Sequence, residues 1–157
     1  MKKKDLILSV LIILIAIIIS FFLRMRSRDI YFYPSYIPQD YKEVKPENDV
    51  IAGSLGIGFV TKFESKDKEV LITTYKESRD IKQICGKGDV GDFTNVELYK
   101  IDNIDICSYN YQKDDLISKQ YYLLKKNKLI RIYEKSQPYL NKDEINKIIL
   151  SLSVKYR

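Results

Sequence analysis

The longest apolar run of the chain lies near its start and limits the architecture more than any other feature. From Leu6 to Leu23 the sequence has 18 residues, of which only Ser9 and Ser20 are polar. As an α-helix such a run extends about 27 Å, close to the thickness of the hydrocarbon core of a bilayer. We therefore expect residues 6–23 to form a single transmembrane helix.

The residues on either side of this run bear on whether the segment is retained. Residues 1–5 form a basic leader, and cleavable signal peptides begin with a leader of the same kind. However, the apolar run is longer than the core of a typical signal peptide, and no pair of small residues suited to cleavage follows it. No cysteine follows it directly, which excludes a lipoprotein anchor. We expect the segment to remain as an uncleaved anchor.

The orientation of the anchor follows from less decisive signals. Basic residues precede the apolar run and also follow it in the juxtamembrane segment, residues 24–35, so the positive-inside rule is nearly balanced. A short basic leader is how export signals begin, and long domains are translocated with little regard for flanking charge. We expect the N-terminus to lie in the cytoplasm and residues 36–157 to form one soluble, extracytoplasmic domain of a single-pass protein in the cell membrane.

The charge and the composition exclude several classes of function. The chain has a net charge of +6, but residues 1–29 hold six of its 27 basic residues and only two of its 21 acidic ones. The remainder is too balanced for a nucleic-acid-binding face. The chain has no histidine, the usual general base near neutral pH and the commonest zinc ligand, and its two cysteines fall short of a soft metal site. We expect no enzyme activity, cofactor, metal or nucleic acid.

Three hairpins are predicted from alternating, β-branched runs that flank short polar turns. Such short connections join antiparallel neighbours, so we expect about six antiparallel strands in meander order. An extended lead-in (residues 31–40) and a short strand precede them, residues 46–58 are predicted as a loop, and a helical turn is expected near residues 81–84. The hairpin strands span residues 57–64 with 69–76, 95–101 with 104–111, and 119–126 with 129–135.

The last element has the pattern of a helix. Asn141 and Glu144 form a capping-box variant, which is typical of a helix start. Four apolar residues then follow at helical spacing, which places them on one stripe that can pack on the sheet. They are Ile145, Ile148, Ile149 and Leu152. The predicted fold class is α+β: an N-terminal transmembrane helix, then an antiparallel meander sheet covered by a C-terminal helix.

Four segments stand out together: residues 36–44, 72–75, 101–109 and 140–152. In their order and motifs they resemble a domain family of unassigned function in low-GC Gram-positive bacteria. Its members stand behind single transmembrane segments, in lipoproteins and in anti-sigma-factor-like proteins. Asp40 and Asn103 stand where glycine is usual in that family, and the fifth strand has no tryptophan. The resemblance implies the fold and the membrane placement, and it implies no active site.

Cys85 and Cys107 are the only cysteines and lie 22 positions apart. In an extracytoplasmic domain they can form a disulfide that ties the long connection to the fourth strand, stabilising the fold by about 3 kcal/mol. The alternative is two unpaired thiols, one of them buried. The sequence leaves both open.

Tyrosine is abundant, with 13 residues, most of them in strand-like runs where an amphipathic ring suits a half-buried sheet. Strand alternation places Tyr109 and Tyr111 on one face and Ile104 and Ile106 on the other, which we assign to the core. We hypothesise that the two tyrosines bind a ligand. The alternative is that their rings pack beneath the connection at residues 77–94 and serve only stability.

These features predict a non-enzymatic, membrane-anchored module that contacts the lipid bilayer through Leu6 to Leu23. Its extracytoplasmic domain is expected to bind or sense a protein or a cell-envelope ligand. The alternative is a pilin-like structural subunit of an envelope assembly, whose N-terminal helix packs into a filament. Pilin-type precursors carry a glycine before the apolar segment and a glutamate just inside it, whereas here Asp5 is followed directly by Leu6.

Overall fold

The computed structural model describes residues 12–19, 29–76, 80–85, 92–135 and 137–156. Ile30–Lys155 form one compact unit, and residues 12–19, which are helical, belong to a separate unit. The leader, more than half of the predicted transmembrane helix and residues 24–28 of the juxtamembrane segment therefore lie outside the described residues. Within the described ranges, no helix is long and apolar enough to cross a bilayer. The membrane anchor stays a prediction.

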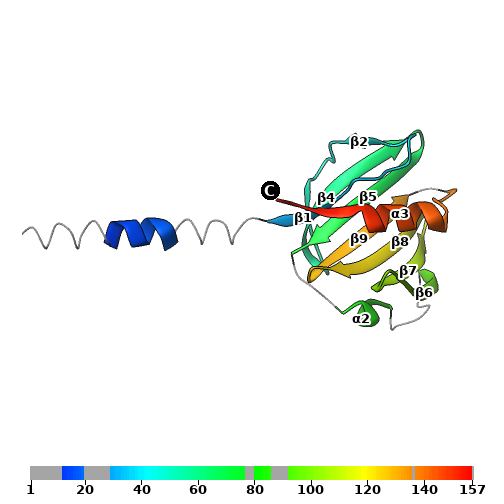
Figure 1. The fold of residues 1–157 in the computed structure, drawn as a ribbon. Helices are drawn as coiled ribbons and strands as arrows, with labels where there is room; N and C mark the ends of the chain where they lie inside the picture. Colours follow the sequence, from blue (N-terminus) through cyan, green and yellow to red (C-terminus); the bar gives the residue numbers. More distant parts are fainter. Residues whose placement is uncertain (1–11, 20–28, 77–79, 86–91, 136, 157) are drawn as a thin grey trace, which may run out of the picture. The chain divides into compact units, whose positions relative to one another are not determined.

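The described part of the compact unit combines antiparallel strands with two helices (Figure 1). The helices are α2 (Ile81–Cys85) and α3 (Lys142–Ser151). The strands are β1 (Ile30–Pro34), β2 (Lys42–Val44), β3 (Val50–Gly53), β4 (Gly56–Ser65), β5 (Lys68–Tyr75), β6 (Phe93–Ile101), β7 (Ile104–Lys113), β8 (Leu116–Lys125), β9 (Lys128–Lys135) and β10 (Leu152–Tyr156).

Among the described residues, the main sheet has eight strands in the order β2-β4-β5-β9-β8-β7-β6, with β3 paired to the first part of β4. A separate two-stranded sheet joins β1 to β10. The predicted α+β class, the antiparallel pairing and the C-terminal helix are confirmed. The three predicted hairpins are present as β4–β5, β6–β7 and β8–β9.

The predicted count of about six strands and their meander order are wrong. After β5 the chain does not pair with β6; β5 pairs with β9, and Thr73 lies opposite Arg131. Burial explains this order, because at least half of the residues of β5 and of β9 are buried, whereas most residues of β6 are exposed. A strand with so little to bury belongs at an edge of the sheet.

Two segments predicted to lack strands are also corrected. The extended lead-in at residues 31–40 contains β1, which finds its partner in β10, directly after the last helix. The loop predicted at residues 46–58 contains β3, where Ile51 lies opposite Gly58. Both strands are short and pair locally or with the chain end, so alternation alone gives little sign of them.

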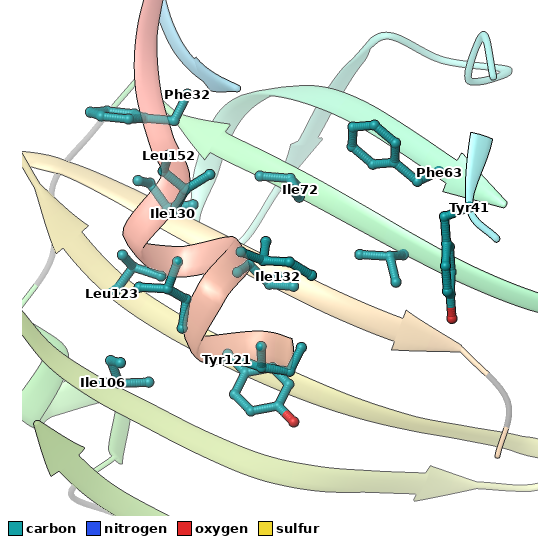
Figure 2. Close-up of a cluster of buried hydrophobic side chains, with 14 residues drawn as sticks. Phe32, Tyr41, Phe63, Ile72, Ile106, Tyr121, Leu123, Ile130, Ile132 and Leu152 are labelled. Carbon is teal, nitrogen blue, oxygen red and sulfur yellow. The ribbon is translucent and has the colours of Figure 1, made fainter. Parts of the chain in front are cut away.

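Helix α3 covers one face of the main sheet and forms the larger core (Figure 2). Its N-cap is the predicted one, because Asn141 Oδ1 accepts a hydrogen bond of 2.9 Å from the Glu144 N–H. The three isoleucines of the predicted stripe are confirmed on α3 and are fully buried, whereas Leu152 lies just after the helix, as the first residue of β10, and is buried in the same core. The partners of this stripe from the strands include Ile72, Ile106, Tyr121, Leu123, Ile130 and Ile132.

A second, smaller core lies on the opposite face of the sheet. Tyr121 and Tyr122 are adjacent in β8 and point to opposite faces, and each is only 3% exposed. Tyr122 joins Ile81 and Cys85 of α2 in the second core. The face away from α3 is therefore partly covered, and a binding surface has to occupy what α2 leaves open.

Candidate functional site

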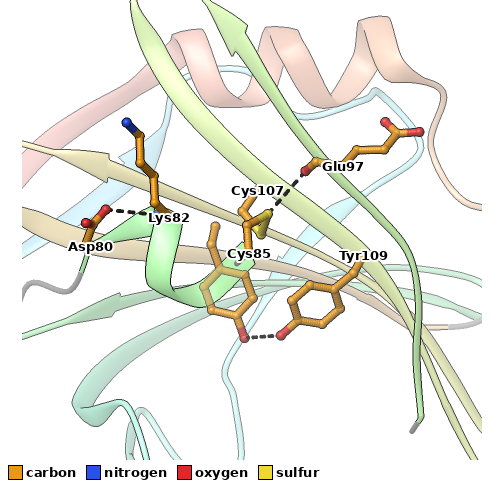
Figure 3. The surroundings of a disulfide bond; sticks show 7 residues. Asp80, Lys82, Cys85, Glu97, Cys107 and Tyr109 are labelled. Carbon is orange, nitrogen blue, oxygen red and sulfur yellow. Dashed lines mark hydrogen bonds between the residues drawn. A yellow bond between two sulfur atoms is a disulfide. The ribbon is translucent and has the colours of Figure 1, made fainter. Parts of the chain in front are cut away.

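Helix α2 is fixed to the sheet by a covalent bond. Cys85, its last residue, forms a disulfide with Cys107 in β7, and their Cα atoms are 5.7 Å apart (Figure 3). At the start of the helix, Asp80 Oδ1 accepts a hydrogen bond of 2.9 Å from the Lys82 N–H. Of the two alternatives for the cysteines, the structure has the bridged one. The bridge holds a short helix against the face opposite α3.

An open pocket of about 420 Å³ lies beside α2 on this face. Its walls come from the β3–β4 turn, from Ile84 of α2 and from the β6–β7 hairpin, and its floor comes from β5, β8 and β9. Pockets of roughly 300–1,000 Å³ are typical of small-molecule sites. The lining residues are Ile51, Ala52, Gly53, Ser54, Leu55, Tyr75, Ile84, Phe93, Tyr109, Tyr111, Gln120, Tyr122 and Arg131.

Aromatic rings form most of one wall and are packed against one another. Phe93 meets Tyr109 edge to face, with 4.9 Å between ring centroids, and lies 5.2 Å from the Tyr111 ring. The Tyr109 ring stacks on Tyr122 at 5.6 Å. A hydrogen-bond chain reinforces the stack: the Tyr109 hydroxyl donates to Tyr122 Oη (3.1 Å), and the Tyr122 hydroxyl donates to Gln120 Oε1 (3.0 Å). Such a wall is preorganised for a flat ligand.

The structure brings together both tyrosines singled out in the sequence. Tyr109 and Tyr111 are half-buried, line the pocket and lie on the face opposite Ile106, as alternation predicts. Phe93, near the end of the long connection, packs on both rings, which supports the alternative that the two tyrosines serve only stability. It applies best to Tyr109, which packs on the second core and whose pKa is raised, first by burial and then by its neighbour Tyr122. Their role in binding stays a prediction.

Arg131 carries the only formal charge among the described residues that line the pocket. Its guanidinium carbon lies 5.8 Å from the ring centroids of both Tyr75 and Tyr133. Its positive charge opposes the pKa increase that burial causes at Tyr75 and Tyr109, so its field reaches the pocket walls. No salt bridge to Arg131 is present in the part of the chain that the structure describes.

Sequence reasoning missed Arg131 as a site residue, although a signal was present. In β9, Arg131 and Tyr133 alternate with Ile130 and Ile132, which places the arginine on the face away from the helix. The sequence does not reveal the pairing of β9 with β5 and β8, and this pairing brings Arg131 beside Tyr75 of β5 and Tyr122 of β8.

Gly58 of β4 leaves room for the side chains of Thr73 and Tyr75 in the neighbouring strand β5, near the floor of the pocket. A Cβ atom added to Gly58 of β4 would stand 2.7 Å from Thr73 Cγ2 and 3.1 Å from the Tyr75 ring. The first distance is shorter than a van der Waals contact, so a side chain here would push Thr73 or Tyr75. The absence of a side chain at Gly58 is therefore part of how the Tyr75 ring is placed.

The described lining consists of aromatic rings, hydroxyls, apolar side chains, one amide and one guanidinium. The described lining residues include no carboxylate, histidine, cysteine or lysine that could act as a general base or a nucleophile near neutral pH. The described residues also contain no group of three or more histidine, cysteine or acidic side chains placed to hold a metal ion. Rings, hydroxyls and one guanidinium suit the recognition of a small polar ligand.

Comparisons with known proteins assign no family. No family model matches the chain, and no curated protein matches its sequence. The solution structure of cyanobacterial PsbP (CyanoP) from Synechocystis sp. PCC 6803 aligns over 80% of this chain and 92% of its own, at 12% identity and a TM-score of 0.45. A likeness at that level supports no conclusion about function. The resemblance to the low-GC Gram-positive family likewise stays a prediction.

Proposed function

We propose that this chain is a non-enzymatic, membrane-anchored binding or sensing module whose extracytoplasmic domain takes up its ligand in the pocket between α2 and the β3–β4 turn. The observation that carries the proposal is the aromatic pocket itself. It is open and of small-molecule size, and it is lined by both tyrosines that strand alternation singles out.

The rigidity of the pocket supports a binding role. The disulfide fixes α2 and with it Ile84, while the hydrogen-bond chain from Tyr109 through Tyr122 to Gln120 fixes one wall. A wall that is ordered before the ligand arrives lowers the entropy cost of binding. A face needed only for stability would be expected to close its tyrosines against α2, without an opening of this volume.

The anchor supports the membrane part of the proposal. The apolar run from Leu6 to Leu23 is long enough to span a bilayer, and residues 12–19, its described part, are helical. An anchored domain that binds a cell-envelope ligand or a partner protein gains from being held at the membrane, because tethering raises the effective concentration of one partner near the other.

The proposal is tested by comparing Tyr111→Ser with Gln112→Ser in the full-length protein. Tyr111 lines the pocket, whereas Gln112 is the exposed next residue of β7 and points to the other face. Melting is followed with and without a dialysable extract of the cell envelope. A ligand at one hundred times its Kd adds about 2.7 kcal/mol to stability, so the melting temperature should rise in the wild type and in Gln112→Ser.

The expected result is that Tyr111→Ser melts within a few degrees of the wild type without extract and does not respond to it. A response equal to that of the wild type would contradict the proposal, as would the absence of any response in all three proteins. A melting temperature many degrees lower without extract would show that the Tyr111 ring is structural.

A further inference from the structure

The charge and the hydrogen-bonding groups of Arg131 indicate what kind of ligand the pocket binds. Arg131 is the only charged side chain among the described residues that line the pocket, and its Nε is buried without a hydrogen-bond partner among those residues. Buried polar groups in native proteins are nearly always paired, and an exception needs an explanation. The buried Nε shows that the protein does not fully satisfy this guanidinium, and a ligand that accepts hydrogen bonds and carries negative charge would bind the guanidinium where Arg131 lines the pocket.

The surroundings of Arg131 strengthen such an interaction. The guanidinium lies near the faces of Tyr75 and Tyr133, which hold it in place, and no described residue forms a salt bridge with it. The ion pairs on described strands β4 and β5 join Lys62 to Glu64 and Glu69, and they do not include Arg131. One positive charge without an ion pair among the described residues favours a ligand with a single negative charge.

The other lining residues indicate the shape and polarity of the rest of the ligand. The Phe93, Tyr109 and Tyr111 rings stand on one wall, and Ile51 and Leu55 contribute apolar side chains. Rings of this kind stack on flat aromatic groups or on the apolar face of a cyclic one. The guanidinium is planar and binds a carboxylate with two parallel hydrogen bonds, which a point charge such as ammonium does not do.

We propose that the pocket binds a small monocarboxylate built on a flat ring, with the carboxylate on Arg131 and the ring against Phe93, Tyr109 and Tyr111. This inference rests on the proposed function, because it names the ligand class of the same pocket.

The absence of tryptophan from the chain makes a direct test simple. Indole-3-acetate, indole-3-acetamide and tryptamine share one ring and carry negative, zero and positive charge. Their indole fluorescence can be excited where tyrosine does not absorb, so it reports the ligand alone. Each is titrated against the full-length protein in detergent, with protein-free detergent as the blank.

Two variants separate the role of Arg131 from that of net charge. Arg131→Gln removes the pocket cation, whereas Lys119→Gln removes one positive charge from the opposite face, where Lys119 lies over the Tyr121 ring. We expect the acid to bind the wild type at least tenfold more tightly than the amide, with the amine weakest. Arg131→Gln should abolish this advantage of the acid, and Lys119→Gln should keep it.

Several results would overturn the inference. These are equal binding of acid and amide to the wild type, no saturable binding of any of the three probes, and an unchanged advantage of the acid in Arg131→Gln. The acid-to-amide comparison needs only the unmodified protein, so it decides the matter even if Arg131→Gln does not fold. If acid and amide bind equally but Tyr111→Ser abolishes the response to envelope extract, the anion inference fails and the proposed function stands.

Discussion

Breaking the disulfide should cost a calculable amount of stability. Cys85 and Cys107 are separated by 22 positions, and closing a loop of this length in the unfolded chain corresponds to about 3 kcal/mol in the chain-entropy model. For a domain of this size, that loss lowers the melting temperature by roughly 10 °C. The five-residue helix α2 is too short to be stable without tertiary contacts, so it should be the first element to come loose.

Reduction of the wild-type protein is the cleaner perturbation, because it keeps both sulfur atoms in place. Cys107 is fully buried, so Cys107→Ser would also bury a hydroxyl; the double variant Cys85→Ala with Cys107→Ala avoids that. Urea unfolding followed by circular dichroism should show a similar loss of unfolding free energy for the reduced wild type and for the double variant. A reductant should have no effect on the double variant, which serves as the control.

The same treatment should also weaken the site. Ile84 of α2 lines the pocket and depends on the bridge at the neighbouring Cys85 for its position. The reasoning would be refuted if reduction changed the free energy of unfolding by less than about 1 kcal/mol, well below the value for a loop of this length.

Three further predictions follow from burial and from topology. Burial raises the pKa of the Glu134 carboxyl, and a hydrogen bond of 2.8 Å from the Leu140 N–H to Oε1 offsets this only in part. A carboxyl whose pKa is raised in the folded state stabilises the protein at pH values below its unfolded pKa, about 4.3, and this stability is lost as the pH rises. In urea unfolding, the stability of Glu134→Gln relative to the wild type should therefore increase from pH 4 to pH 7. A difference in unfolding free energy that stays constant over this range would contradict the prediction. Ile148→Ala, at a fully buried position of α3, should cost about 2–5 kcal/mol, whereas Leu150→Ala on its exposed side should change stability by less than about 0.5 kcal/mol. With the domain outside, Asp115→Cys in the exposed β7–β8 turn should react with an impermeant thiol reagent on intact cells stripped of wall, and labelling only after lysis would reverse the topology.

Local signals in the sequence predict much of the fold. Alternation and polar turns identify the three hairpins, and Asn141 with the isoleucine stripe identifies α3, because each depends on residues a few positions apart. The pairing of β5 with β9 joins residues about 60 positions apart, and no local pattern encodes it. The same limitation explains the missed pairing of β1 with β10.

The site was predictable to a similar extent. Alternation within β7 correctly places Tyr109 and Tyr111 together on the face away from Ile106. The pocket also needs Phe93 and Arg131, which reach it from the sheet edge and from a central strand. The side chains that surround a strand depend on its neighbours in the sheet, and local sequence patterns do not predict the order of the strands.

The most direct test of the binding role is photo-cross-linking in intact cells from a benzoylphenylalanine side chain placed at position 111. Position 112 in the same strand is the control, because Gln112 is exposed and faces the other way. If the pocket binds the ligand, mass spectrometry should find a reproducible adduct at position 111 that is absent or much weaker at position 112. No adduct at position 111, or equal yields at the two positions, would contradict the claim that this face of the sheet is the binding site.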